Sequence, residues 1–231
     1  MRRSRIAGLL LVSMATLAQQ SQPVEITSEP RHHLVFENEY VRVFDVTVEP
    51  KTSTLVHRHN HDYLFVTLGD SDVASVRPGE QPVHLVLKDG ETRFTPGNFA
   101  HAAINQSDKP FHNITIELLK PSTNVATCKE SCSAPCPGGS DACGSRAEQL
   151  ITSDQWIVTS INSETGKFPA EAEKSPRLLI AVDNIGKINA SQAIGSNGQL
   201  GWASPYSSVS FDVAKPGPAK YVSVSFRPEK P

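Results

Sequence analysis

The chain has 231 residues, of which 38% are hydrophobic, and its formal net charge is −2. This length suffices for one or two ordinary hydrophobic cores, and the composition excludes a largely disordered chain. The 22 Lys and Arg residues are balanced by 24 Asp and Glu residues without a long basic run. Because a phosphate backbone needs a basic surface, nucleic acid is excluded as the expected partner, and a small molecule takes its place.

The first eighteen residues have the pattern of a secretory signal peptide. Residues 1–5, MRRSR, are cationic, and residues 6–18 form an apolar segment that ends in Thr16-Leu17-Ala18, where small residues suit a signal peptidase. The apolar segment is too short to span a bilayer comfortably. We therefore expect residues 1–18 to be removed and the mature protein to be periplasmic or secreted, with no membrane partner after cleavage.

The remainder of the chain has the pattern of β-structure. In the first half, runs rich in β-branched and aromatic residues occur at 40–48, 63–68, 83–87 and 112–119, separated by turn residues. The second half has similar runs at 156–161, 177–185, 207–213 and 220–226. No window has a convincing helical period. Because many short strands must protect their edges, we predict an all-β chain built from closed or double-sheet barrels.

A segment rich in Cys, Pro and Gly separates the two halves at residues 122–147. In an exported protein, an even number of clustered cysteines most simply forms disulfides, here with three alternative pairings. A thiolate metal site is the other interpretation, but the segment lacks the CxxC pairs of zinc ribbons. We therefore predict disulfides within this connection among Cys128, Cys132, Cys136 and Cys143.

Histidines in the first half are candidate metal ligands. His57 and His59 are two residues apart, so on a strand their side chains project from the same face. A third histidine, His101, follows a glycine-containing turn. Three imidazoles, with or without a carboxylate, can hold a divalent transition metal and leave coordination positions open. We interpret four other histidines as surface or satisfied core residues: His32, His33, His84 and His112.

The residues around His101 resemble the second motif of the cupin superfamily, G-x5-P-x-G-x2-H-x3-N. Gly90, Pro96, His101 and Asn105 match its fixed positions, and Asn98 stands where the second glycine is usual. Because asparagine tolerates a positive φ better than other non-glycine residues, this exchange is mild.

The first cupin motif, G-x5-H-x-H-x3,4-E-x6-G, is matched more loosely. His57, His59 and Gly69 fit it, Lys51 replaces the leading glycine, and the glutamate is absent.

The position of that missing glutamate is ambiguous. Counting back from the closing glycine places Asp62 there, whereas counting forward from the two histidines places Tyr63 there. The resemblance implies a site of three histidines and one carboxylate in the first case. In the second case it implies a three-histidine site similar to that of thiol dioxygenases within the cupins. His61 is an alternative ligand.

The two halves of the chain also resemble one another. Residues 62–71 are similar to 176–185, 90–105 to 198–213, and 111–119 to 220–228. In this overlay His101 falls on Val209, and the other two histidines fall on Glu171 and Glu173, which we interpret as part of a solvated loop. The repeat predicts two jelly-roll barrels, each a double-stranded β-helix: a metal-site barrel at 31–121 and a degenerate barrel at 148–228.

The resemblance implies one divalent transition metal in the first barrel, Fe, Mn, Ni, Cu or Zn. With open positions, such a centre suits a dioxygenase-type oxidoreductase that acts on a small molecule, or Lewis-acid chemistry such as isomerisation or decarboxylation. The alternative is a non-catalytic barrel that binds a small ligand, with or without a structural metal. Cupins commonly dimerise through barrel edges, so the resemblance also implies a homodimer.

Overall fold

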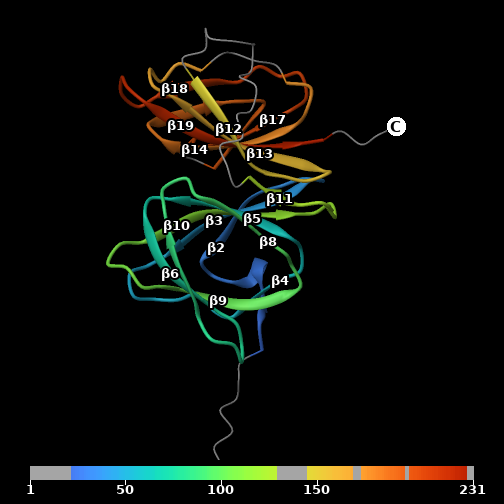
Figure 1. The fold of residues 1–231 in the computed structure, drawn as a ribbon, viewed down its shortest axis with the longest axis vertical. Helices are drawn as coiled ribbons and strands as arrows, with labels where there is room; N and C mark the ends of the chain where they lie inside the picture. The colour runs from blue at the N-terminus through green and yellow to red at the C-terminus, as the bar shows by residue number, and fades with distance from the viewer. Residues whose placement is uncertain (1–21, 129–144, 169–172, 196–197, 228–231) are drawn as a thin grey trace, which may run out of the picture.

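The computed structural model describes residues 22–128, 145–168, 173–195 and 198–227 (Figure 1). These ranges contain nineteen strands and one 3-10 turn at Ile26–Ser28. The prediction of an all-β chain is therefore confirmed. Among the described residues, no helix is long and apolar enough to cross a membrane. The predicted signal peptide lies outside the described ranges, as do Cys132, Cys136, Cys143 and Glu171.

The first half forms a barrel of two five-stranded sheets. One sheet has the order β1 (Val24–Glu25), β4 (His57–His59), β9 (Phe99–Asn105), β6 (Ser71–Val76) and β7 (Val83–Leu87). The other has the order β2 (His32–Glu37), β3 (Val41–Val48), β10 (Phe111–Leu118), β5 (Tyr63–Leu68) and β8 (Thr92–Thr95). Buried side chains from both sheets form one apolar cluster between them, which includes Phe44, Val46, Val73, Leu87 and Phe111.

The first barrel begins before residue 31, the start expected from the sequence. Strand β1 runs parallel to β4, with Val24 opposite His57 and Glu25 opposite Arg58. The 3-10 turn then leads to β2. The segment before residue 31 therefore belongs to the wall of the barrel that carries the histidine pair.

The second half forms a seven-stranded sheet and a two-stranded sheet. The larger sheet has the order β11 (Ala126–Thr127), β12 (Ser145–Thr152), β13 (Trp156–Ser163), β19 (Ala219–Phe226), β14 (Arg177–Asp183), β17 (Leu200–Ala203) and β16 (Gln192–Ile194). The smaller sheet pairs β15 (Ile185–Asn189) with β18 (Ser210–Val213). Apolar side chains fill the space between them, including Leu179, Ile188, Val209, Phe211 and Tyr221.

The two barrels are stacked, and their contact is a shared hydrophobic core. Figure 1 shows the second half, coloured yellow to red, on top of the first, with β4 and β9 on the side of the first barrel away from this contact. The core contains buried side chains of both halves, among them Val43, Leu64, Ile116, Trp156, Leu178 and Val224. Strands β5, β10, β14 and β19 are buried on both faces for most of their length, because each separates a barrel interior from this shared core.

Strand pairing supports most of the sequence repeat. Leu64 pairs with Phe94 in the first barrel, and Leu178 pairs with Trp202 in the second, as the overlay of residues 62–71 on 176–185 and 90–105 on 198–213 requires.

The third repeat segment was aligned one residue out of register. Ile116 lies opposite Leu64, and Val224 lies opposite Leu178, so Ile116 corresponds to Val224 and not to Ser225 as the sequence overlay has it. The error has a physical reason. Strands buried on both faces lose the alternation of apolar and polar residues that would fix their register.

Candidate metal centre

The first barrel encloses a cavity of about 450 Å³. Both sheets contribute to its wall. The apolar part includes Val46, Phe65, Val73, Leu87, Phe99 and Phe111, and the polar part includes His32, His57, His59, Tyr63, Arg77 and His101. A cavity of this size, mostly apolar with a few convergent polar groups, has the character of a small-molecule site.

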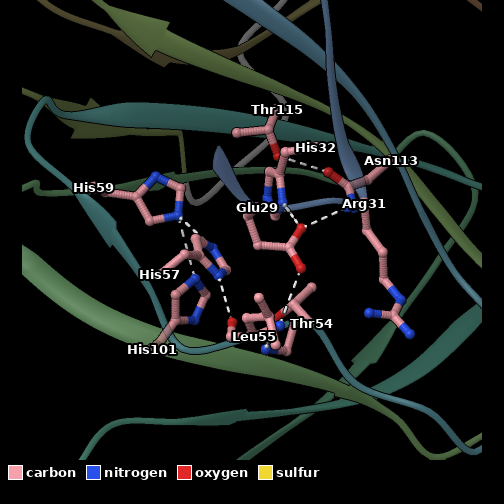
Figure 2. Close-up of polar contacts among 11 residues, drawn as sticks. Glu29, Arg31, His32, Thr54, Leu55, His57, His59, His101, Asn113 and Thr115 are labelled. Atoms are coloured by element: carbon pink, nitrogen blue, oxygen red, sulfur yellow. Dashed lines mark hydrogen bonds and ion pairs between the residues drawn. The ribbon is translucent and has the colours of Figure 1, made fainter. Parts of the chain in front are cut away.

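The three predicted histidines meet at one end of this cavity. In β4, His57 and His59 are each 1% exposed, and the intervening Arg58 is only half-buried, as strand alternation requires. His101 in β9 pairs directly with His57 across the two strands. Figure 2 shows the three rings turned toward one another.

The Nε2 atoms of these rings lie at the spacing of ligands that share one metal. His59 Nε2 is 3.1 Å from His57 Nε2 and 3.3 Å from His101 Nε2. Two nitrogens that each bind one metal at about 2.0–2.1 Å lie roughly 2.9–3.4 Å apart in octahedral or tetrahedral geometry. Both separations from His59 Nε2 therefore fit nitrogens bound to one metal.

The Nδ1 atoms show how two of the rings are oriented. His57 Nδ1 donates to the Leu55 carbonyl oxygen at 2.9 Å, so its Nε2 carries a lone pair. His101 Nδ1 lies 2.8 Å from Ser75 Oγ. Outer hydrogen bonds of this kind hold a metal-binding imidazole in place. Among the described residues, none forms a hydrogen bond with the buried His59 Nδ1. A neutral His59 carries one proton, so its Nε2 cannot donate to the lone pairs of both His57 and His101.

All three imidazoles are neutral at pH 7. Burial lowers the pKa of His57 to about 4, helped by the nearby His32. Burial also lowers the pKa of His101 to about 3, helped by His57, and lowers the pKa of His59 further, helped by His101. Neutral imidazole is the form that binds a metal. The donor atoms, their spacing and their protonation state thus fit a divalent transition metal.

A fourth histidine, which the sequence reading assigned to the surface or core, lies beside this group. His32 at the start of β2 is 8% exposed and lines the cavity. Its ring centroid is 4.5 Å from that of His57, and His32, His57 and His59 offer ligand atoms that all lie within 4.8 Å of one another. Neither cupin motif includes the N-terminal strand, so motif spacing could not find it.

The other three histidines that we interpreted as surface or satisfied core residues have those roles in the structure. His33 is exposed, and His84 and His112 form hydrogen bonds with Asp72 and Asp45.

His32 is held by a buried carboxylate. Glu29, 2% exposed, accepts a hydrogen bond from His32 Nδ1 at 2.7 Å. It also accepts from the backbone N–H groups of Leu55 and Arg31, at 3.0 and 2.8 Å. Burial alone would raise the pKa of Glu29, but these hydrogen bonds lower it to about 2. Glu29 is therefore a carboxylate at neutral pH.

At the ambiguous position of the missing glutamate, the structure places Tyr63 in the cavity. Its ring stacks on His59 with centroids 4.0 Å apart, and burial raises its pKa to about 12. Asp62 instead accepts a hydrogen bond from the Gly97 backbone N–H at 2.8 Å, and neither Asp62 nor His61 lines the cavity. Asp62 lies in the corner before β5, where its hydrogen bond stabilises the turn, and it does not face the candidate metal centre.

A cation lies in the cavity wall near the histidines. Arg77 places its guanidinium carbon 4.0 Å from the Phe99 ring centroid, and its charge acts on His101 and Tyr63. Among the described residues, Arg77 has no carboxylate partner within salt-bridge distance, whereas Arg93, also in the wall, pairs with Glu91. Arg77 is thus available to a negatively charged group.

The second barrel lacks an equivalent donor set in its described part. Val209, which corresponds to His101, is buried in the apolar interior. Glu173 pairs with Arg177 at 2.9 Å instead of facing solvent alone. The sequence has no histidine after His112. Apolar side chains form the core in the described part of this barrel.

No protein-family model matches the sequence, and no curated protein matches it. Solved structures do. AerE from Microcystis aeruginosa matches over 89% of this chain and 98% of its own, with a TM-score of 0.62 and 11% identity. Salicylate 1,2-dioxygenase from Pseudaminobacter salicylatoxidans matches over 83% and 75%, with a TM-score of 0.54 and 13% identity. The chain has the cupin fold.

The same fold occurs in proteins of different kinds. Vicilin from Capsicum annuum matches with a TM-score of 0.56 and 11% identity, over 81% of this chain and 76% of its own. The cupin likeness therefore shows the fold of this chain, and its function has to be argued from the residues of the first barrel.

Proposed function

We propose that this protein is an exported cupin that binds one divalent transition metal in its first barrel and acts there on a small molecule as a dioxygenase-type oxidoreductase. The observation that carries the proposal is the convergence of three neutral imidazoles, from His57, His59 and His101, in the wall of the cavity. When bound, such a metal supplies Lewis-acid and redox chemistry at positions that the protein leaves open.

The cavity wall indicates the kind of molecule that binds. Its lining is mostly apolar, Tyr63 presents a protonated phenol beside His59, and Arg77 offers a charge that no carboxylate of the described residues pairs with. These groups suit a small molecule with an apolar body and an anionic group. Two of the similar structures are, by name, a salicylate 1,2-dioxygenase and an oxalate decarboxylase, and both names refer to small acids.

The first experiment is a metal analysis by mass spectrometry of protein purified without chelator or affinity metal. Near-stoichiometric Fe, Mn, Ni, Cu or Zn in the wild type, lost in His101→Ala, would establish the centre and identify the metal. Oxygen consumption with a panel of small aromatic and aliphatic acids then tests the oxidoreductase. Absence of metal in both proteins, even after reconstitution, would reject the proposal.

A second candidate function, a non-catalytic barrel that binds a small ligand, is favoured by one observation. Among the residues that line the cavity, Glu80 is the only carboxylate, and it is exposed. The enclosed part of the cavity therefore lacks a carboxylate general base. Nitric oxide distinguishes the two functions: binding to the Fe(II)-loaded protein shows an open coordination position and favours the enzyme, and an inert spectrum favours the binder.

Export and disulfide formation belong to the same proposal. The pattern of residues 1–18 and the even number of clustered cysteines support them. Intact-mass analysis of protein from the periplasm or medium tests both, because it reports a chain that starts at Gln19 and a loss of two hydrogen atoms for each disulfide formed by oxidation.

A further inference from the structure

The N-terminal segment of the first barrel packs directly against the metal centre. Strand β1 lies beside β4, with Val24 opposite His57. The chain then turns through Ile26–Ser28 and reaches Glu29 and His32. Figure 2 shows the side chains of Glu29 and His32 next to His57. This segment therefore adds polar side chains to a site whose motif histidines lie on β4 and β9.

The hydrogen bonds of His32 leave one nitrogen for a ligand. Its Nδ1 faces the Glu29 carboxylate, which can only accept, so Nδ1 carries the proton and Nε2 carries the lone pair. Within the described part of the chain, no residue forms a hydrogen bond with His32 Nε2, and the side chain lines the cavity. His32 and Glu29 are both buried, with 8% and 2% of their surface exposed.

His32 is close enough to His57 and His59 to share a metal with them. The ligand atoms of His32, His57 and His59 lie within 4.8 Å of one another. Opposite nitrogens on one metal lie roughly 4.2 Å apart, at about 2.1 Å from the ion. The spread of these atoms is therefore close to that of one coordination sphere.

We propose that His32 is a fourth nitrogen ligand of the metal centre and that Glu29 is the carboxylate that orients it. This inference rests on the proposed metal function and deepens it. It also accounts for the absence of a carboxylate ligand at the glutamate position of the first motif, because Asp62 accepts a hydrogen bond from the Gly97 N–H. The carboxylate of the site, Glu29, instead contacts the ligand His32 and does not itself bind the metal.

Glu29 also orients a second ligand, His57, through the backbone of one residue, Leu55. Its Oε1 accepts the Leu55 N–H at 3.0 Å, and the Leu55 carbonyl accepts the proton of His57 Nδ1 at 2.9 Å. A single buried carboxylate thus sets the direction of His32 directly and supports that of His57. A site of four imidazoles favours Cu, Zn, Ni or Fe over Mn, because Mn prefers oxygen ligands.

The test is electron paramagnetic resonance of the Cu(II)-loaded protein, combined with a titration by Co(II). We expect nitrogen couplings from four imidazoles in the wild type and from three in His32→Ala. We also expect Co(II) affinity to fall at least about tenfold in His32→Ala and about 10-fold to 100-fold in Glu29→Gln. His33→Ala is the matched control, because His33 is adjacent and exposed, and it should change neither measurement.

The outcomes separate this inference from the proposed function. Three nitrogen couplings in the wild type, unchanged in His32→Ala, would overturn the role of His32 and leave the metal centre intact. No binding of Cu(II) or Co(II) by the wild type would overturn both. If His32→Ala does not fold, as judged by far-UV circular dichroism, the wild-type nitrogen count and the Glu29→Gln affinity still decide the matter.

Discussion

His57 and His101 face each other as direct partners in the β4–β9 pair, with ring centroids 4.7 Å apart. The pairing of these strands brings the two rings together. We therefore expect His57→Ala and His101→Ala to lose the metal and remain folded, because a preformed barrel does not need a catalytic metal as a zinc finger does. Metal analysis and far-UV circular dichroism of the same samples check this. Unfolding of either variant would instead identify a structural metal.

Asp62 and Tyr63 should respond differently to substitution. Asp62→Ala should keep its metal and lower the free energy of unfolding by about 1–2 kcal/mol, because it removes the acceptor of the Gly97 N–H. Tyr63→Phe should also keep its metal, since the phenol ring is stacked on His59 and is not needed as a ligand. Metal content and urea unfolding are the measurements. Loss of metal in Asp62→Ala at unchanged stability would make Asp62 a ligand after all.

Local sequence patterns located much of this fold because they report local geometry. The runs at 63–68 and 83–87 match β5 and β7 in full. The H-x-H spacing found His57 and His59 because alternate residues of a strand share a face. The choice between Asp62 and Tyr63 depends on where the corner ends and β5 begins, which neither motif count could fix.

His32 shows what the sequence could not reveal. Its position depends on the parallel pairing of β1 with β4, which no spacing along the chain specifies. The one-residue error between residues 111–119 and 220–228 has a related cause, because both strands are buried on two faces. Long-range pairing, and not composition, supplies the missing information in both cases.

The turn before β9 contains two adjacent residues, Gly97 and Asn98, that differ in which substitutions they should tolerate. Asn98 has a φ of 61°, so Asn98→Gly should be nearly neutral and Asn98→Val should cost about 1–2 kcal/mol. Gly97 has a different constraint, because a Cβ there would overlap the backbone of His61. Gly97→Ala should therefore destabilise the protein more than Asn98→Val. Urea denaturation of the three variants measures this order, and a harmless Gly97→Ala would refute the packing argument.

The stability of the metal-free protein should depend on pH through its buried histidines. An unfolded histidine has a pKa of about 6.5, whereas the folded values are about 4 for His57 and about 3 for His101. Between these limits the unfolded chain binds more protons. The free energy of unfolding should therefore be highest above a pH of about 6.5 and should decrease as the pH drops toward about 4. Denaturation at pH 7 and pH 5 checks this, with His57→Gln as a variant whose slope should be smaller. Equal stability at the two pH values would contradict the prediction.

The shared core implies that the second barrel stabilises the first. Trp156 of the second barrel is 1% exposed, and its ring centroid is 5.7 Å from that of Phe94 in the first. Trp156→Ala should lower the free energy of unfolding by about 3–5 kcal/mol, because it opens a cavity in a core that belongs to both barrels.

Because the two barrels share this core, chemical denaturation of the wild type should show one transition, seen together by far-UV circular dichroism and by the spectrum of Co(II) in the first barrel. Loss of the Co(II) spectrum at the same denaturant concentration as the β-structure would mean that the second barrel keeps the metal centre of the first barrel assembled. Two separate transitions would mean that the apolar contact only joins two independent domains.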